Sequence, residues 1–157
     1  MEILDLIQPD LIFTQLEVKS KNELFKVLSG QLIKKGYVKE SFLSGLLDRE
    51  KTYPTGLELK NFGCALPHTD KEHVIKPVIT VALLKNPVVF KNMENPKNEV
   101  NVNLVFMLAL NNSEHQIEAL RQLAALIQND SFYEKVSKIK SGDEILTIIK
   151  GFDRVGI

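Results

Sequence analysis

The chain has 157 residues, a length that suits one compact domain with a hydrophobic core. Hydrophobic residues make up 44% of it, and twenty basic residues balance twenty acidic ones, which argues against binding to nucleic acid or to an anionic membrane. A single cysteine excludes an intrachain disulfide and fits a reducing, cytoplasmic location, and the longest apolar run, 104–110, is too short for insertion into a membrane.

The first third of the chain is predicted to contain one strand followed by two helices. Residues 11–18 are rich in apolar and β-branched side chains, as strands are. Residues 20–36 carry apolar side chains at helical spacing, and Ser20 and Glu23 have the spacing of a capping box. Residues 40–51 repeat the helical pattern and predict a second helix.

The middle of the chain is predicted to form the sheet. A turn comes first, with Pro54 and Gly56 at its second and fourth positions. Residues 86–90 predict a short edge strand or hairpin arm. Three nearly continuous apolar runs are typical of strands covered on both faces, at residues 62–66, 78–84 and 102–110.

Three helices are predicted to close the chain. The clearest covers residues 113–128, and two shorter ones cover 131–139 and 143–152, the last with Ser141 and Glu144 at capping-box spacing. Buried strands with helices before and after them indicate an α/β fold. We expect a three-layer α/β/α sandwich with a mixed central sheet, formed as a single domain over residues 1–157.

A histidine follows the predicted strand 62–66. Pro67 cannot donate to a strand ladder, so the strand ends there and His68 lies at its carboxyl end. In open α/β sheets, ligands bind outside the carboxyl ends of the strands. A neutral imidazole can act as a nucleophile or a base. Position alone leaves open a second interpretation, in which His68 merely finishes the strand and hydrogen-bonds a loop.

Two other residues could join His68 in a site for a phosphoryl group. His115 lies in the first turn of the 113–128 helix, where free N–H groups and the helix dipole attract anions. Arg49, near the end of the 40–51 helix, offers a guanidinium fork for phosphoryl oxygens. The alternatives are a solvent-exposed histidine and an arginine that complements the helix dipole.

Other reactive side chains suggest no different chemistry. His73 is expected to lie on the surface. Cys64 stands about 13 Å from His68 if the strand is extended, so we interpret it as a core residue rather than a nucleophile. The sequence has no HExxH, cysteine pair, GxSxG, Walker or GxGxxG motif, and we expect neither a metal nor a cofactor.

Two segments carry a resemblance to a known family. They are "LLDREKTYPTGLELKNFGCALPHTD" at 46–70 and "LALNNSEHQIEALRQLAALI" at 108–127. Both resemble the enzyme IIA domain of the fructose–mannitol group of the bacterial phosphoenolpyruvate:sugar phosphotransferase system. Within that group, the residues "YPTGL" and "ALPHTD" are most similar to the galactitol-type branch. Thr69 departs from the pattern because many relatives have glycine there, and His115 departs from the galactitol type.

The resemblance implies a role for each candidate residue. His68 would take a phosphoryl group from phosphohistidine HPr and pass it to a cysteine of enzyme IIB, which serves the membrane enzyme IIC. His115 would contact the phosphoryl group, and Arg49 would lie near it. In the family the phosphorylated ring nitrogen is generally Nε2. The sequence leaves three functions open. The first is this transferase, a component of sugar uptake. The others are a regulatory paralogue of the nitrogen type and a binding domain whose histidines are incidental.

The surroundings of His68 can also be anticipated. Because two proteins must reach the histidine in turn, we expect a shallow, exposed site. An apolar rim would suit weak, transient docking. The candidates for this rim are Leu57, Phe62 and Val74.

Overall fold

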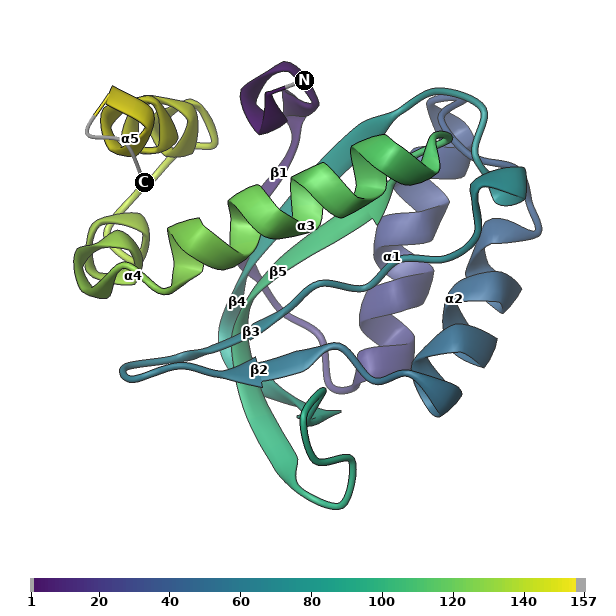
Figure 1. Cartoon of the computed structure of the whole chain (residues 1–157), viewed down its shortest axis with the longest axis horizontal. Coiled ribbons are helices and arrows are strands. Elements are labelled where there is room, and N and C mark those ends of the chain that lie inside the picture. Colours follow the sequence, from purple (N-terminus) through teal and green to yellow (C-terminus); the bar gives the residue numbers. More distant parts are fainter. Residues whose placement is uncertain (1, 155–157) are drawn as a thin grey trace.

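A computed structural model describes residues 2–154 (Figure 1). Within them, one sheet has the strand order β1-β4-β5-β3-β2. β1 runs parallel to β4 and β3 parallel to β5, while β4 with β5 and β2 with β3 pair antiparallel. The strands are β1 (Ile7–Leu16), β2 (Gly56–Glu58), β3 (Gly63–Ala65), β4 (Val78–Lys91) and β5 (Glu99–Ala109). The predicted mixed sheet is therefore confirmed.

Helices cover both faces of this sheet. The helices are α1 (Lys21–Lys34), α2 (Phe42–Thr52), α3 (Ser113–Ile127), α4 (Asp130–Val136) and α5 (Asp143–Arg154), with short 3-10 turns η1 (Ile3–Asp5) and η2 (Lys71–His73). Phe25 of α1 and Phe42 of α2 are buried in one core with Val105 of β5. Leu123 of α3 and Ile149 of α5 are buried in the other core. The three-layer sandwich that the sequence predicts is thus present.

The predicted helix starts follow from local hydrogen bonds. The Ser20 side chain accepts the N–H of Glu23 at 3.1 Å, which is half of a capping box. The Glu23 carboxylate accepts the N–H of Lys19 at 3.0 Å, one residue before the expected partner. At α5, Glu144 accepts the N–H of Ser141 at 2.9 Å. The first contact satisfies an N–H group that the helix end would leave without a partner, and the other two join the chain before each helix to its first turn.

The prediction of a separate short strand at 86–90 is wrong. These residues belong to β4, which continues to Lys91 and pairs with β5 along both halves. The register shifts between Leu83 and Val88, and Pro87 lies inside this irregular stretch. A proline has no N–H to donate to the neighbouring strand, so it fits a place where the pairing is interrupted. It breaks the run of apolar residues in the sequence, but the strand continues through it.

The sheet topology determines where His68 lies. β3 and β5 are parallel neighbours, with Cys64 opposite Leu104. Their pairing continues past the end of β3 to a bridge between His68 and Leu108, and the Leu108 N–H donates to the Pro67 carbonyl at 2.9 Å. The carboxyl ends of both strands therefore lie side by side at the same end of the sheet, and from there the chain enters α3 (Figure 1). Among residues 2–154, no helix is long and apolar enough to cross a membrane.

The close approach of β3 and β5 yields a stability prediction. A Cβ atom on Gly63 would lie 2.0 Å from the Asn101 carbonyl oxygen. We expect Gly63→Ala to lower the free energy of unfolding by about 1–3 kcal/mol, because the backbone must move apart. Gly30→Ala on the open face of α1, where a Cβ meets nothing within 4 Å, should instead raise it by about 0.5–1 kcal/mol. Urea unfolding of both variants checks this, and equal midpoints would contradict it.

Candidate functional site

The His68 ring is held by one hydrogen bond to its own strand. Its Nδ1 lies 2.8 Å from the carbonyl oxygen of Leu66. A carbonyl can only accept, so Nδ1 carries the proton in the neutral ring and Nε2 keeps its lone pair. The main chain thus selects the tautomer in which Nε2 is the nucleophilic nitrogen.

Several influences act on the pKa of His68. Burial lowers this pKa, the hydrogen bond to Leu66 opposes that shift, the positive charge of Arg49 lowers the pKa further, and Asp70 raises it. The net effect is a pKa below the ordinary value of 6.5. The ring is therefore neutral at pH 7, as a nitrogen nucleophile must be.

The expectation of an exposed histidine is wrong. His68 is only 7% exposed, and Pro67 and Thr69 on either side of it are also buried. A β-bridge joins His68 to Leu108 of β5, forty residues away in the chain. Its neighbour Asp70 is exposed and lines two pockets. Nothing in the sequence distinguished His68 from Asp70 in exposure, because the burial comes from segments distant in the chain.

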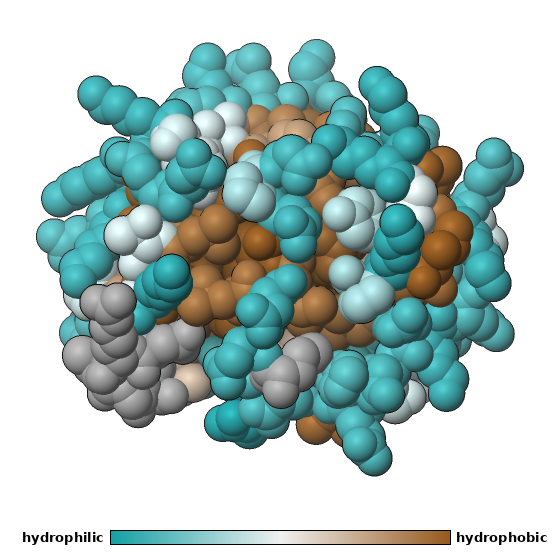
Figure 2. All heavy atoms as spheres, turned by 90° about the horizontal axis from the view of Figure 1, so that it is seen from above, coloured by the Kyte–Doolittle hydropathy of each residue, from teal (hydrophilic) through white to brown (hydrophobic). Residues whose placement is uncertain are grey.

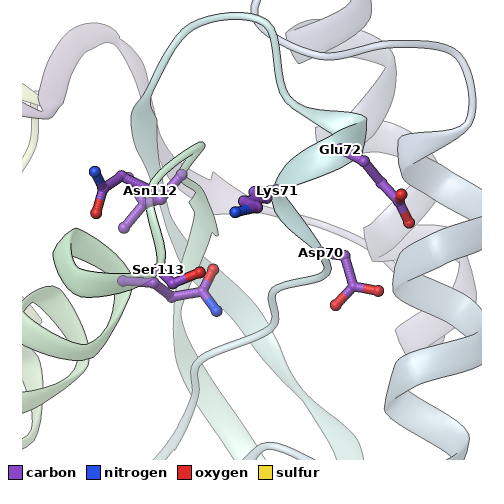
Figure 3. A pocket seen from close by; sticks show the side chains of 7 residues that line it. Asp70, Lys71, Glu72, Asn112 and Ser113 are labelled. Atoms are coloured by element: carbon purple, nitrogen blue, oxygen red, sulfur yellow. The ribbon is translucent and has the colours of Figure 1, made fainter.

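The two pockets lie on either side of the loop that follows His68. The α2 pocket, of about 310 Å³, is lined by Gly45, Asp48, Arg49, Thr52, Tyr53, Thr69, Asp70 and His73. The α3 pocket, of about 300 Å³, is lined by Asp70, Lys71, Glu72, Leu110, Asn112, Ser113 and Gln116. In Figure 3 the side chains of Asp70 and Glu72 come from this loop, and those of Asn112 and Ser113 come from the start of α3.

Arg49 is the candidate that the structure brings near His68. It lies in the last turn of α2, where it is half-buried, and its guanidinium carbon is 5.1 Å from the centre of the Tyr53 ring. Its Nε is buried, and no described residue accepts a hydrogen bond from it. Stacking on Tyr53 orients the guanidinium, whose Nε–H keeps no hydrogen-bond acceptor among the described residues.

Sequence reasoning missed the role of Glu50. Its carboxylate is buried and accepts the Thr55 N–H at 2.7 Å and the Thr55 hydroxyl at 2.8 Å. Burial raises the pKa of Glu50, against the lowering effect of these two hydrogen bonds. The Thr55 carbonyl in turn accepts the Leu66 N–H at 3.3 Å. Glu50 therefore ties α2 to the strand whose Leu66 carbonyl holds the His68 ring.

His115 lies at the same edge of the sheet but is not joined to His68. It is exposed in the first turn of α3, and among the described residues no hydrogen bond connects the two histidines. The Asn112 side chain accepts the N–H groups of Glu114 at 2.9 Å and His115 at 3.1 Å. These helix N–H groups, which the sequence suggested as anion donors, are therefore already engaged.

The other reactive side chains have structural partners. His73 lies at the surface but is half-buried, with its side chain 20% exposed and its Nδ1 2.8 Å from the Ser41 hydroxyl. Cys64 is fully buried, and burial raises the pKa of its thiol, so its interpretation as a core residue is confirmed. Within residues 2–154, no group of three or more His, Cys, Asp or Glu side chains could hold a metal ion.

The predicted apolar rim is wrong in its residues. Phe62 stacks on Tyr133 with ring centres 4.3 Å apart, Leu57 packs against the core, and Val74 is 7% exposed. Among the described residues, the large apolar or aromatic side chains with the highest exposure are instead Ile117 at 70%, Tyr53 at 61% and Ile75 at 51%. Figure 2 shows one face on which apolar residues gather inside a hydrophilic border.

Comparisons with known proteins agree on one family. Residues 5–151 match the family described as phosphoenolpyruvate-dependent sugar phosphotransferase system, EIIA 2. The galactitol-specific EIIA component of Escherichia coli (strain K12) is 28% identical over 114 residues, which are 73% of this chain and 75% of that protein. The transcriptional regulator ManR of Bacillus subtilis (strain 168) is 28% identical over 87% of this chain, which spans only 20% of ManR.

Solved structures agree with the sequence matches. The complex of enzyme IIAMTL and phosphorylated enzyme IIBMTL from Escherichia coli contains a chain with a TM-score of 0.76 and 28% identity. The alignment covers 93% of this chain and 99% of that one. The similarity therefore extends over almost the whole chain.

The lowered pKa of His68 predicts how stability depends on pH. The unfolded chain binds a proton at this histidine near pH 6.5 that the folded chain takes up only at lower pH. Stability should therefore decrease as the pH falls below about 6.5. In His68→Gln, which cannot titrate there, this part of the decrease should be absent. Urea unfolding at several pH values measures both proteins, and parallel pH profiles would contradict the prediction.

Proposed function

Because the chain belongs to the phosphoenolpyruvate-dependent sugar phosphotransferase system EIIA 2 family, whose domains relay phosphoryl groups, we propose that it carries a phosphoryl group on His68. The donor is phosphohistidine HPr, and the acceptor is a cysteine of enzyme IIB. The observation that carries this proposal is the Nδ1 hydrogen bond to Leu66, which leaves Nε2 of a neutral ring free to attack.

The transfer can be followed through its bonds. The Nε2 lone pair of His68 attacks phosphorus, and the bond from phosphorus to the donor histidine breaks, so that its electron pair returns to the donor ring. The His68 ring then bears a positive charge, and its Nδ1–H donates a stronger, charge-assisted hydrogen bond to the Leu66 carbonyl. The same carbonyl that selects the tautomer thereby stabilises the product.

Onward transfer reverses these changes. The thiolate of the enzyme IIB cysteine attacks phosphorus, the bond from phosphorus to Nε2 breaks, and its electron pair returns to the ring. His68 regains the neutral tautomer with the proton on Nδ1. No metal enters, because the nucleophile is an uncharged nitrogen and the protein supplies the positive charge near the phosphoryl oxygens.

We assign the stabilising role mainly to Arg49. Its charge already acts on His68, and its buried Nε has no acceptor among the described residues. A guanidinium donates to phosphoryl oxygens with fixed geometry. His115 would act as a second stabiliser at the edge of the site, in contact with the phosphoryl group when a partner has docked. Its exposure makes that contact weaker than the one from Arg49.

The partners follow from the relatives. Enzyme IIAMTL is solved in complex with phosphorylated enzyme IIBMTL, which supports an enzyme IIB as the acceptor here. Enzyme IIC would be reached only through enzyme IIB and need not touch this chain. The galactitol-specific relative makes a galactitol system the first to test.

A regulatory function is the second candidate. A relative of this chain forms part of a transcriptional regulator, ManR. In that case phosphorylation of His68 would switch the binding of another protein instead of feeding transport. The two functions differ in the next step, because a transport component passes its phosphoryl group rapidly to enzyme IIB.

Phosphoryl labelling tests the proposal directly. After incubation with phosphoenolpyruvate, enzyme I and HPr, the wild-type protein should gain the mass of one phosphoryl group, and His68→Ala should gain none. Addition of the matching enzyme IIB should remove the label from wild type within the mixing time. An unlabelled wild type, or a labelled His68→Ala, would contradict the proposal.

Two variants separate the stabilising residues from the nucleophile. Arg49→Gln and His115→Ala should still be labelled, with the rate falling by about 10²–10³ for Arg49→Gln and less for His115→Ala, because each removes one donor from the transition state. Gly30→Ala on α1, where an added Cβ meets nothing within 4 Å, is the control that should be labelled at the wild-type rate. Complete loss of labelling in His115→Ala would mean that its role is wrongly assigned.

A further inference from the structure

The loop that follows His68 fits against a glycine of α2. A Cβ atom built on Gly45 would lie 2.9 Å from Thr69 Oγ1 and 3.0 Å from both Cδ2 and Nε2 of His73. Real Cβ atoms almost never come closer than 3.0 Å to another atom, and contacts of 3.0 Å are tighter than nine in ten real ones, so the neighbouring side chains would have to shift. Only glycine at position 45 therefore leaves Thr69 and His73 where they are.

Further contacts hold the same loop to the connection between α1 and α2. Nδ1 of His73 lies 2.8 Å from the Ser41 hydroxyl, and the His73 carbonyl accepts the Lys39 N–H at 2.9 Å. A β-bridge joins Val38 to Val74. Thr69 is 4% exposed, so its contact with Gly45 is packed rather than solvated. The loop thus rests on α2 and on the segment before it.

The helix that receives this loop also carries Arg49. Gly45 and Arg49 are four residues apart in α2, so they share one helix face, and both line the α2 pocket with Thr69. Thr69 follows His68 directly in the chain. A shift of the Thr69 main chain away from α2 would therefore move the His68 ring relative to the guanidinium of Arg49.

We propose that Gly45, Thr69 and His73 form a positioning contact that sets the distance between the His68 ring and the Arg49 guanidinium. This inference rests on the proposed function and adds to it a group of positioning residues, none of which touches the phosphoryl group. It also accounts for Thr69, since the threonine side chain occupies the space that Gly45 leaves open. A misplacement of about 1 Å at a reacting group can slow a reaction about 10²-fold.

Paired substitutions test the contact. Gly45→Ala should slow labelling by phosphohistidine HPr about 10-fold or more at saturating HPr, with little change in KM, because the orientation and not the docking is altered. Thr69→Ala removes Oγ1, the nearest of the three contacts, and should restore part of the rate that Gly45→Ala loses, while the contact with His73 remains in the double variant. Gly30→Ala on α1, where a Cβ meets nothing within 4 Å, is the matched control and should leave the rate unchanged.

A second readout does not depend on phosphoryl transfer. In an NMR titration, the pKa of His68 should move toward its ordinary value in Gly45→Ala and return part of the way in the double variant, because the ring moves relative to its burial and to Arg49. Ser41→Ala, which removes an exposed hydrogen bond to His73 and leaves the core intact, should slow labelling by about 2–5-fold.

The outcomes distinguish this inference from the proposed function. If wild type is not labelled at all, the proposed function fails, and the titration alone decides the positioning contact. If wild type is labelled and Gly45→Ala matches it in rate and in the pKa of His68, the positioning contact is wrong. A slow Gly45→Ala that the second substitution does not rescue would also overturn it.

Discussion

The hydrogen bond from Nδ1 of His68 to the Leu66 carbonyl is the constraint around which the site is arranged. It joins a side chain to the main chain two residues earlier, so it depends on the path of the chain through Pro67 more than on any distant residue. With Nδ1 engaged, only Nε2 can act as a nucleophile. Burial keeps the ring neutral at pH 7, and a neutral ring is the form that can accept a phosphoryl group.

The position of that carbonyl depends on α2. The buried carboxylate of Glu50 holds Thr55, and Thr55 pairs with Leu66. A buried carboxylate is costly unless its oxygens accept hydrogen bonds, and here both oxygens do. The same helix presents Arg49 to the site. One helix thus supports the acceptor of the Nδ1 proton and also supplies the cation for the phosphoryl oxygens.

Much of this arrangement could be predicted from the sequence, for physical reasons. Apolar runs that lack alternation indicate strands covered on both faces, and Pro67 marks where such a strand stops, so the sandwich and the strand-end placement of His68 were both accessible. The burial of His68 was not, because it is created by packing between segments far apart in the chain. The same holds for the rim, where Phe62 stacks on Tyr133 from α4 and does not face a partner.

The most direct test of this account is the tautomer of His68 in the unphosphorylated protein. Two-bond ¹H–¹⁵N correlation spectra at pH 7 report which ring nitrogen carries the proton. The account predicts a protonated Nδ1 and an unprotonated Nε2 in one neutral ring. A proton on Nε2, or a ring that carries a proton on both nitrogens at that pH, would contradict the claim that the Leu66 carbonyl prepares His68 for phosphoryl transfer.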